Sequence, residues 1–161
     1  MRSSQWASAA LATVALGLLI SACGEGGGSS STPTATCTGS GKSVEVVVET
    51  GSHHVVDRCV GFTGPSIKGE TALRRSKIEF ATQHFSFGDA VCQIDSDPKS
   101  YTDCFGTGKP YWALFVWSGA GKWKLASTGI SDITLNSHQA LGWRFVPSAG
   151  TPPPPPRPPK F

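Results

Sequence analysis

The stretch Tyr111–Trp117, which reads YWALFVW, decides the fold of this 161-residue chain. Large apolar side chains occupy both sets of alternating positions in it, whereas a strand with one face in water alternates apolar with polar residues. We therefore expect a central strand that is covered on both faces. Ser118–Gly121 follows as a turn, and Lys122–Leu125 is expected to return as the second strand of a hairpin.

A second hairpin is expected nearer the N-terminus. Ser43–Thr50 alternates valines with Glu45 and Glu49, a pattern that predicts a half-buried strand. A Gly-Ser turn follows, and His53–Val60 supplies a β-branched return strand.

The remaining elements complete one small domain. A single short helix is expected over Glu70–Lys77, with Thr71 as its N-cap and basic residues near its negative C-terminal end. Further strands are expected at Ile78–Phe87, Ala90–Ile94, Ile133–Leu135 and Gly142–Val146. The predicted fold class is α+β, a mainly antiparallel β-sheet domain with one short helix, over residues 37–147.

Residues 1–22 have the pattern of a bacterial lipoprotein signal peptide. Ala7–Ile20 is almost wholly apolar but short for a membrane span, and Ile20-Ser21-Ala22-Cys23 matches a lipobox. We expect Cys23 to carry lipid and to anchor the exported protein to the outer face of the bacterial cell membrane. The alternative is ordinary cleavage that leaves Cys23 as a spare thiol. Residues 23–36, which contain no large apolar side chain, are expected to form a flexible Gly/Ser/Thr tether.

The C-terminus is rich in proline. Residues 148–161 include the run PPPPPRPP, which predicts a disordered tail with a solvated polyproline II backbone. Such a segment is either a spacer that crosses a cell wall or a ligand for an SH3-like groove, and the exported context favours the spacer.

The cysteine count is odd, and a lipid-bearing Cys23 leaves four others. An even number of cysteines in an exported chain indicates two disulfides, for which three pairings exist. We predict the bonds Cys37–Cys59 and Cys92–Cys104, because each pair brackets one local strand–turn unit. Zinc is a poor alternative, since no pair has C-x-x-C spacing and no histidine lies in a finger-like pattern.

Composition and motifs exclude several classes of function. The net charge of +3 is too small to indicate a nucleic-acid partner. The sequence contains no G-x-S-x-G elbow, P-loop or H-E-x-x-H motif, and its acidic residues do not fit a calcium loop. We therefore predict a monomeric protein that is not an enzyme and uses no metal or cofactor.

Aromatic residues are the unusual feature of the last third of the domain. Trp117 and Trp123 flank a hairpin turn, where alternate strand faces cannot all be buried. They are the best candidates for a surface platform that stacks on a ring-shaped ligand or on a partner protein. Tyr111, Trp112 and Trp143 are weaker candidates for the same surface, because such rings usually serve as core.

Several segments together resemble a known family. The similar stretches are Lys109–Phe115, Gly121–Trp123, Gly129, Leu141–Phe145, Val91–Asp95, Asp103-Cys104, Val46–Val48 and Asp57–Cys59. In their order and spacing they resemble the transcobalamin-like C-terminal domain family (DUF4430), in the form found in secreted actinobacterial lipoproteins.

The resemblance implies a β-rich module that contacts a ligand. In vitamin B12 carriers this module forms one half of a clamp whose other half is a helical barrel, and the present chain is too short to include that barrel. It also departs from the family at Asn136–Leu141, where a Gly-Asp turn usually precedes the last strand.

Two functions from different classes follow. The first is a membrane-anchored surface lipoprotein that carries a small-ligand-binding or accessory module, with a corrinoid or a carbohydrate as the expected ligand class. The second is a non-enzymatic module for interaction or scaffolding in the cell envelope, with no small-molecule ligand and with the proline-rich tail and edge strands as its contacts.

Overall fold

The computed structural model describes residues 37, 41–52, 54–119, 121–148, 152, 155 and 157–161. The signal peptide predicted at 1–22, the tether at 23–36 and the lipid-bearing Cys23 lie outside these residues. Thr32–Phe161 form one compact unit, which is the unit described below. Within the described ranges, no helix has the length and apolar character needed to cross a membrane.

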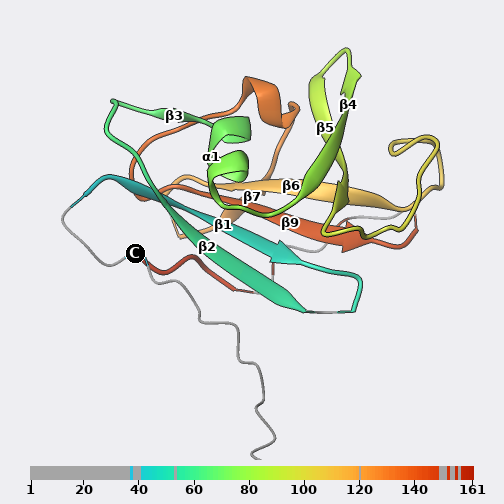
Figure 1. The fold of residues 1–161 in the computed structure, drawn as a ribbon, viewed down its shortest axis with the longest axis horizontal. Coiled ribbons are helices and arrows are strands. Elements are labelled where there is room, and N and C mark those ends of the chain that lie inside the picture. The colour runs from blue at the N-terminus through green and yellow to red at the C-terminus, as the bar shows by residue number, and fades with distance from the viewer. Residues whose placement is uncertain are drawn as a thin grey trace, which may run out of the picture. The chain divides into compact units, whose positions relative to one another are not determined.

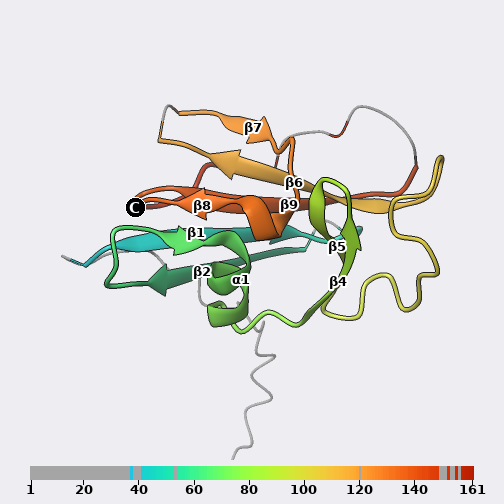
Figure 2. The same ribbon diagram turned by 90° about the horizontal axis from the view of Figure 1, so that it is seen from above.

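A five-stranded sheet in the order β2-β1-β9-β6-β7 forms the centre of the domain (Figures 1 and 2). Its strands are β2 (Val55–Gly61), β1 (Ser43–Glu49), β9 (Ala140–Val146), β6 (Tyr111–Trp117) and β7 (Trp123–Leu125). The expected hairpins are both present, as β1–β2 and β6–β7. β6 is an interior strand with β9 and β7 as neighbours, as the YWALFVW stretch predicts, although β9 and not β6 is the middle strand.

One strand pair departs from the antiparallel pattern. β1 and β9 run parallel, with Val47 opposite Gly142 and Glu49 opposite Arg144. This pairing joins the N-terminal hairpin to the last strand of the domain, so every other element lies between them in the sequence. The α+β class with a mainly antiparallel sheet and one short α-helix is confirmed.

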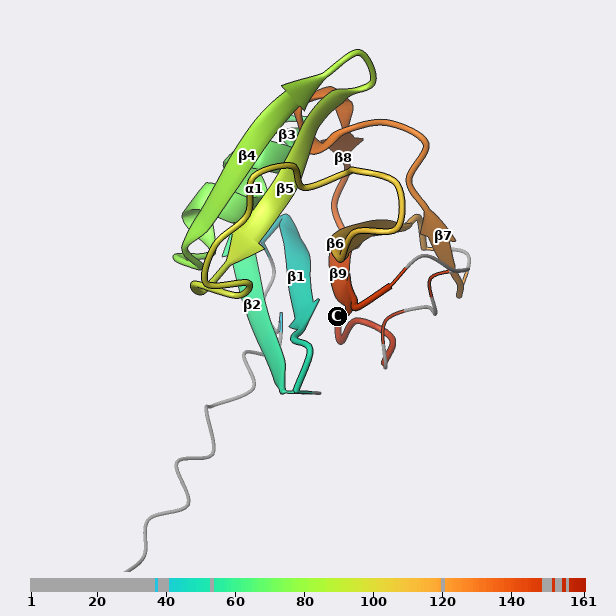
Figure 3. The same cartoon turned by 90° about the vertical axis from the view of Figure 1, so that its right-hand side faces the viewer.

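A layer of short elements covers one face of the sheet (Figure 3). It contains β3 (Ile67–Lys68), α1 (Gly69–Arg75), β4 (Phe80–Phe85), β5 (Gly88–Ile94), the 3₁₀ turn η1 (Ile130–Asp132) and β8 (Thr134–Leu135). One expectation about this layer is wrong: Lys68 and not Thr71 is the N-cap of α1, without a side-chain cap bond. The strand expected at Ile133–Leu135 is present as β8, which pairs with β3 outside the main sheet.

The main core lies between this layer and the sheet. Val44, Val46 and Val48 of β1 point into it and are fully buried, as the valine–glutamate alternation predicts. Leu73 of α1 and Trp143 of β9 are buried against the same cluster. A helix as short as α1 is not stable by itself, so its position depends on this packing.

The second face of the sheet is also covered, contrary to the half-buried strand expected for β1. Glu45 and Glu49 of β1, with Asp57 of β2, are buried on it. The described part of the C-terminal segment packs over this face: Lys160 donates its backbone N–H to Glu45, and Arg157 forms an ion pair with Asp57. The prediction of a solvated, disordered tail over 148–161 is therefore wrong for these residues, because buried carboxylates on the sheet hold them.

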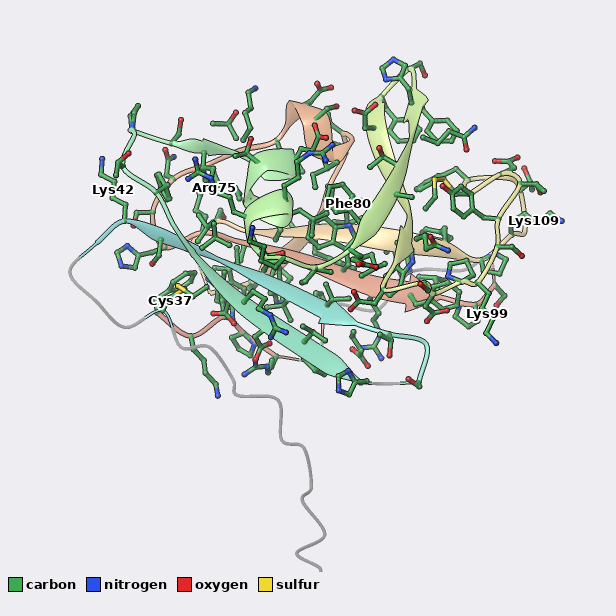
Figure 4. All side chains as sticks on the ribbon, viewed as in Figure 1. Cys37, Lys42, Arg75, Phe80, Lys99 and Lys109 are labelled. Atoms are coloured by element: carbon green, nitrogen blue, oxygen red, sulfur yellow. A yellow bond between two sulfur atoms is a disulfide. The ribbon has the colours of Figure 1, made fainter. Side chains whose placement is uncertain are left out.

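Both predicted disulfides are confirmed, Cys37–Cys59 and Cys92–Cys104. Figure 4 shows Cys37 at one end of the domain and Lys99 and Lys109 at the other, on the loop that joins β5 to β6. Each disulfide therefore ties down a different end of the fold. Two disulfides in a domain of this size are typical of an extracellular protein.

Candidate functional site

An apolar pocket of about 310 Å³ opens between the β4–β5 hairpin and β6. Its lining comes from four segments: the hairpin turn and β5, the β5–β6 loop, the first half of β6, and the chain that leaves β7. Ligand pockets in proteins start at about this volume and are mainly apolar, with a few polar groups. This pocket is therefore the candidate site among the described residues.

Aromatic rings form one side of the pocket entrance. Phe85 and Phe87 stack with ring centroids 5.2 Å apart, and Phe105 lies 5.4 Å from Phe87. Tyr111 continues the series at 5.3 Å from Phe105. Phe87 and Phe105 are 36% and 42% exposed, so their rings present apolar surface to solvent at the entrance. A ring of a ligand can extend this series of contacts by stacking or edge contact.

Covalent and backbone bonds hold the entrance in place. The Cys92–Cys104 disulfide ties the loop to β5 one residue before Phe105. The backbone N–H of Gly129 donates to the carbonyl of Phe87 at 2.6 Å, which fixes the hairpin turn against the segment after β7. The two aromatic residues of the entrance are thus attached to fixed points although both lie outside strands.

The floor of the pocket belongs to β6. β7 pairs only with Phe115–Trp117, so the first half of β6 extends beyond the end of β7. Trp112 and Leu114 lie there, and the Trp112 indole N–H is satisfied by the carbonyl of Asp97 at 2.9 Å. Leu125 closes the opposite side and is 54% exposed. An apolar ligand that covered Leu125 would remove this surface from water.

Few polar groups line the pocket. Asp89 contacts His84 through Oδ1 and Nδ1 at 2.7 Å, and its backbone N–H donates to the Ser131 hydroxyl at 3.0 Å. Ser127 and Thr128 add hydroxyl groups on the wall. Within the described part of the chain, no group of three or more His, Cys, Asp or Glu side chains is placed to hold a metal ion. The arrangement is suited to holding an apolar ring with a polar substituent.

The structure separates the five aromatic residues predicted as ligand contacts. Trp143 is fully buried in the core, so the prediction that it contacts a ligand is wrong. Trp112 is 1% exposed, and it is a core residue whose edge forms pocket floor, not part of a surface platform. Tyr111 alone of the five lies at the pocket entrance.

Trp117 and Trp123 form a partly exposed pair on the β6–β7 hairpin, with ring centroids 5.4 Å apart and an edge-to-face angle of 69°. They do not line the apolar pocket, but both rings line a separate surface hollow together with Pro155, Arg157 and Pro158. The Trp123 indole N–H donates to the carbonyl of Arg157 at 3.0 Å, so the C-terminal segment lies on it.

Sequence reasoning missed Phe87, Phe105 and Leu125 at the pocket. A signal existed for Phe105, because it is a large apolar residue within a polar, turn-rich stretch where no core position is expected. No local pattern shows that these stretches meet, since Phe87 and Leu125 are brought together by the tertiary fold.

No protein-family model and no curated protein matches this chain. Among solved structures, it is similar to one from Ruminococcus gnavus ATCC 29149 described as "a putative metal binding protein". The identity is 11% and the TM-score 0.47, over 66% of this chain and 97% of that chain. A likeness of this size carries no information about ligands.

Proposed function

We propose that this protein is an exported, lipid-anchored surface protein whose domain binds a small ligand with an apolar ring in the pocket beside β6. The observation that supports it most directly is the pocket itself: about 310 Å³, lined by Phe87, Phe105, Tyr111 and Leu125 at its entrance. The resemblance to the transcobalamin-like domain family agrees with a ligand-contacting module. Corrinoids and carbohydrates remain the ligand classes to be tested first.

The neutral fluorescent probe N-phenyl-1-naphthylamine tests the pocket, because it is apolar and aromatic. Leu125→Asp places a carboxylate on the pocket wall, at a side chain exposed enough for the fold to tolerate it. We expect the affinity for the probe to fall by about tenfold or more, as a lost apolar contact and a buried charge require.

Tyr101→Asp is the matched control, because Tyr101 is 37% exposed and lies outside the pocket. It should leave the probe affinity within about twofold of wild type, a difference well under 1 kcal/mol. Cobinamide, cobalamin and glycans are then measured as competitors. Failure of the wild-type chain to bind the probe or any competitor at millimolar concentration, or equal effects of the two substitutions, contradicts the proposal.

The lipid anchor is tested separately by intact mass of the protein extracted from membranes. We expect a mature chain that begins at an acylated Cys23 and is lighter by four hydrogens for the two disulfides. An unmodified Cys23, or a chain that keeps residues 1–22, contradicts the anchor without affecting the pocket.

A second candidate function, an interaction module of the cell envelope, is favoured by a different observation. A proline-rich segment is seated on the second face of the sheet, where an exported scaffold would bind a partner. That face is independent of the pocket.

A further inference from the structure

The second face of the sheet contacts the C-terminal segment at separate points along the segment. Lys160 donates its backbone N–H to Glu45 Oε2 at 2.5 Å and accepts a hydrogen bond from the Cys37 backbone N–H at 3.3 Å. Three residues earlier, the carbonyl of Arg157 accepts the Trp123 indole N–H at 3.0 Å. These bonds involve the backbone of the segment, as expected for recognition of an extended chain.

Charge complementarity adds to the backbone contacts. The Arg157 guanidinium pairs with the Asp57 carboxylate, whose side chain is only 4% exposed. Glu45 is fully buried on the same face. The second oxygens of both carboxylates, Glu45 Oε1 and Asp57 Oδ1, have no hydrogen-bond partner among the described residues. A carboxylate that is covered without a partner is costly, and the segment that covers this face also supplies the cation that pairs with Asp57.

The missing side chain at Gly142 leaves space on the sheet surface that a proline fills. Pro155 is buried, and it lies over Gly142 of β9 beside the Trp123 ring. A Cβ at Gly142 would lie 2.7 Å from Pro155 Cγ and 2.9 Å from the Trp123 ring, so only glycine allows this approach. At the end of the chain, the rings of Phe161 and His138 meet edge to face at 5.5 Å.

These features combine an aromatic surface for proline with an acidic group for arginine, the combination that proline-rich ligands require. A polyproline segment has no internal hydrogen bonds and is already extended, so it loses little conformational entropy on binding. Trp123, Asp57 and Glu45 come from three different strands, so the surface exists only in the folded sheet.

We infer that this face is a recognition site for a basic, proline-rich segment, with residues 152–161 of the same chain as its ligand. Arg157 supplies the positive charge that pairs with Asp57, Pro155 fills the space over Gly142, and the Trp123 indole N–H binds the carbonyl of Arg157. The site lies apart from the apolar pocket. Binding of the C-terminal segment to it does not require a ligand in that pocket.

The test uses the full chain with Arg157→Glu, which replaces the ion pair with Asp57 by a repulsion. The NMR signal of the Trp123 indole N–H reports whether the segment is seated, and Trp123→Phe assigns that signal. We expect Arg157→Glu to shift the signal and to speed its exchange with solvent by at least tenfold. The matched control is Lys99→Glu, which makes the same change of charge at an exposed side chain on the β5–β6 loop and should leave the signal in place.

A synthetic peptide of residues 152–161 then supplies the ligand from outside. Added to the Arg157→Glu chain, it should return the Trp123 signal to the wild-type position, whereas the same peptide carrying Arg157→Glu should not. The wild-type chain should not respond, because its own tail covers the site. If the folded Arg157→Glu chain shows no change in the Trp123 signal with the wild-type peptide, the recognition site is contradicted. If the wild-type chain responds to the peptide equally, the assignment of its own tail as the ligand is contradicted.

Sedimentation of the wild-type chain separates binding within one chain from exchange between two copies. We expect a monomer at all concentrations measured. A dimer that dissociates on Arg157→Glu would show that the tail belongs to a second copy, and it would overturn the assignment within one chain.

Discussion

Glu45 shows how strongly one residue's environment can differ from its sequence pattern. It lies on β1 at a position that alternation assigns to solvent, yet it is fully buried under the C-terminal segment. Burial raises the pKa of the Glu45 carboxyl above its ordinary value, while the Lys160 N–H and the positive charges of Arg157 and Lys160 oppose the change without cancelling it. The carboxylate form is thus disfavoured in the folded protein.

Glu45→Gln should make the protein more stable at pH 7. Because burial raises the pKa of Glu45 in the folded state, that state binds the proton more tightly, and wild-type stability falls as the pH rises through this raised pKa. Glutamine removes the buried charge, and its amide oxygen can still accept the Lys160 N–H. Urea unfolding at pH 4 and pH 7 measures the free energy of unfolding.

The control for this prediction is Glu79→Gln, at an exposed carboxyl, which should not raise the free energy of unfolding at pH 7. A Glu45→Gln protein that is less stable than wild type at pH 7 would show that the attraction to Arg157 and Lys160 exceeds the cost of burial.

At the scale of elements, the position of the long β5–β6 loop depends on its disulfide. The loop has no strand between Ile94 and Tyr111, and it carries Phe105 to the pocket entrance. Cys92–Cys104 is the covalent tie that limits where Phe105 can lie. Cys37–Cys59 closes the other end of the domain and does not line the pocket.

Replacing both Cys92 and Cys104 by serine should therefore weaken pocket binding and stability together. A disulfide that closes a loop of this length contributes about 3 kcal/mol to the free energy of unfolding. We expect probe affinity to fall by about tenfold as Phe105 loses its fixed position. Titration with N-phenyl-1-naphthylamine under conditions where the variant remains folded measures this.

The matched control is the double serine variant at Cys37 and Cys59. It should lose stability to a similar extent but keep its affinity for the probe, because it leaves the pocket loop tied. Equal loss of affinity in the two variants would mean that the probe reports global stability rather than the position of Phe105.

At the scale of the whole domain, the sheet carries a covering layer on each face. The short elements from β3 to β5, with η1 and β8, supply one, and the C-terminal segment supplies part of the other (Figure 3). Gly142 lies on the middle strand of the sheet, directly beneath Pro155 of the C-terminal segment.

Gly142→Ala should displace the segment without altering its charge. The added methyl group collides with Pro155 and Trp123, so we expect the free energy of unfolding to fall by about 1–3 kcal/mol. Hydrogen exchange at the Lys160 amide should rise as its bond to Glu45 opens. Gly61→Ala is the control, because a Cβ there meets only the Lys42 carbonyl at 3.9 Å; an undisturbed Lys160 amide in the Gly142 variant would contradict the packing.

Local patterns predicted most of the strands and the helix but not the candidate site. YWALFVW predicts an interior strand and the valine–glutamate alternation predicts a strand with one core face, because both depend on the two-residue period of a β-strand. The pocket joins Phe87, Phe105 and Leu125, which lie in separate segments with no common period. Trp112 and Trp143 were misplaced because composition does not tell a buried indole from an exposed one.

The sequence by itself predicted the strands other than β3, two hairpins, the short helix and the favoured pairing of the four cysteines, since each rests on neighbours in the chain or on a local bracket of cysteines. Only the tertiary structure decided three further points: the parallel pairing of β1 with β9, the apolar pocket, and the seating of the proline-rich segment. Each joins residues distant in the sequence, and the last also depends on burial. A glutamate that alternates with valines on a strand is expected to face water, and only a segment distant in the sequence can bury it. Glu45 and Asp57 meet the C-terminal segment only after the sheet has formed.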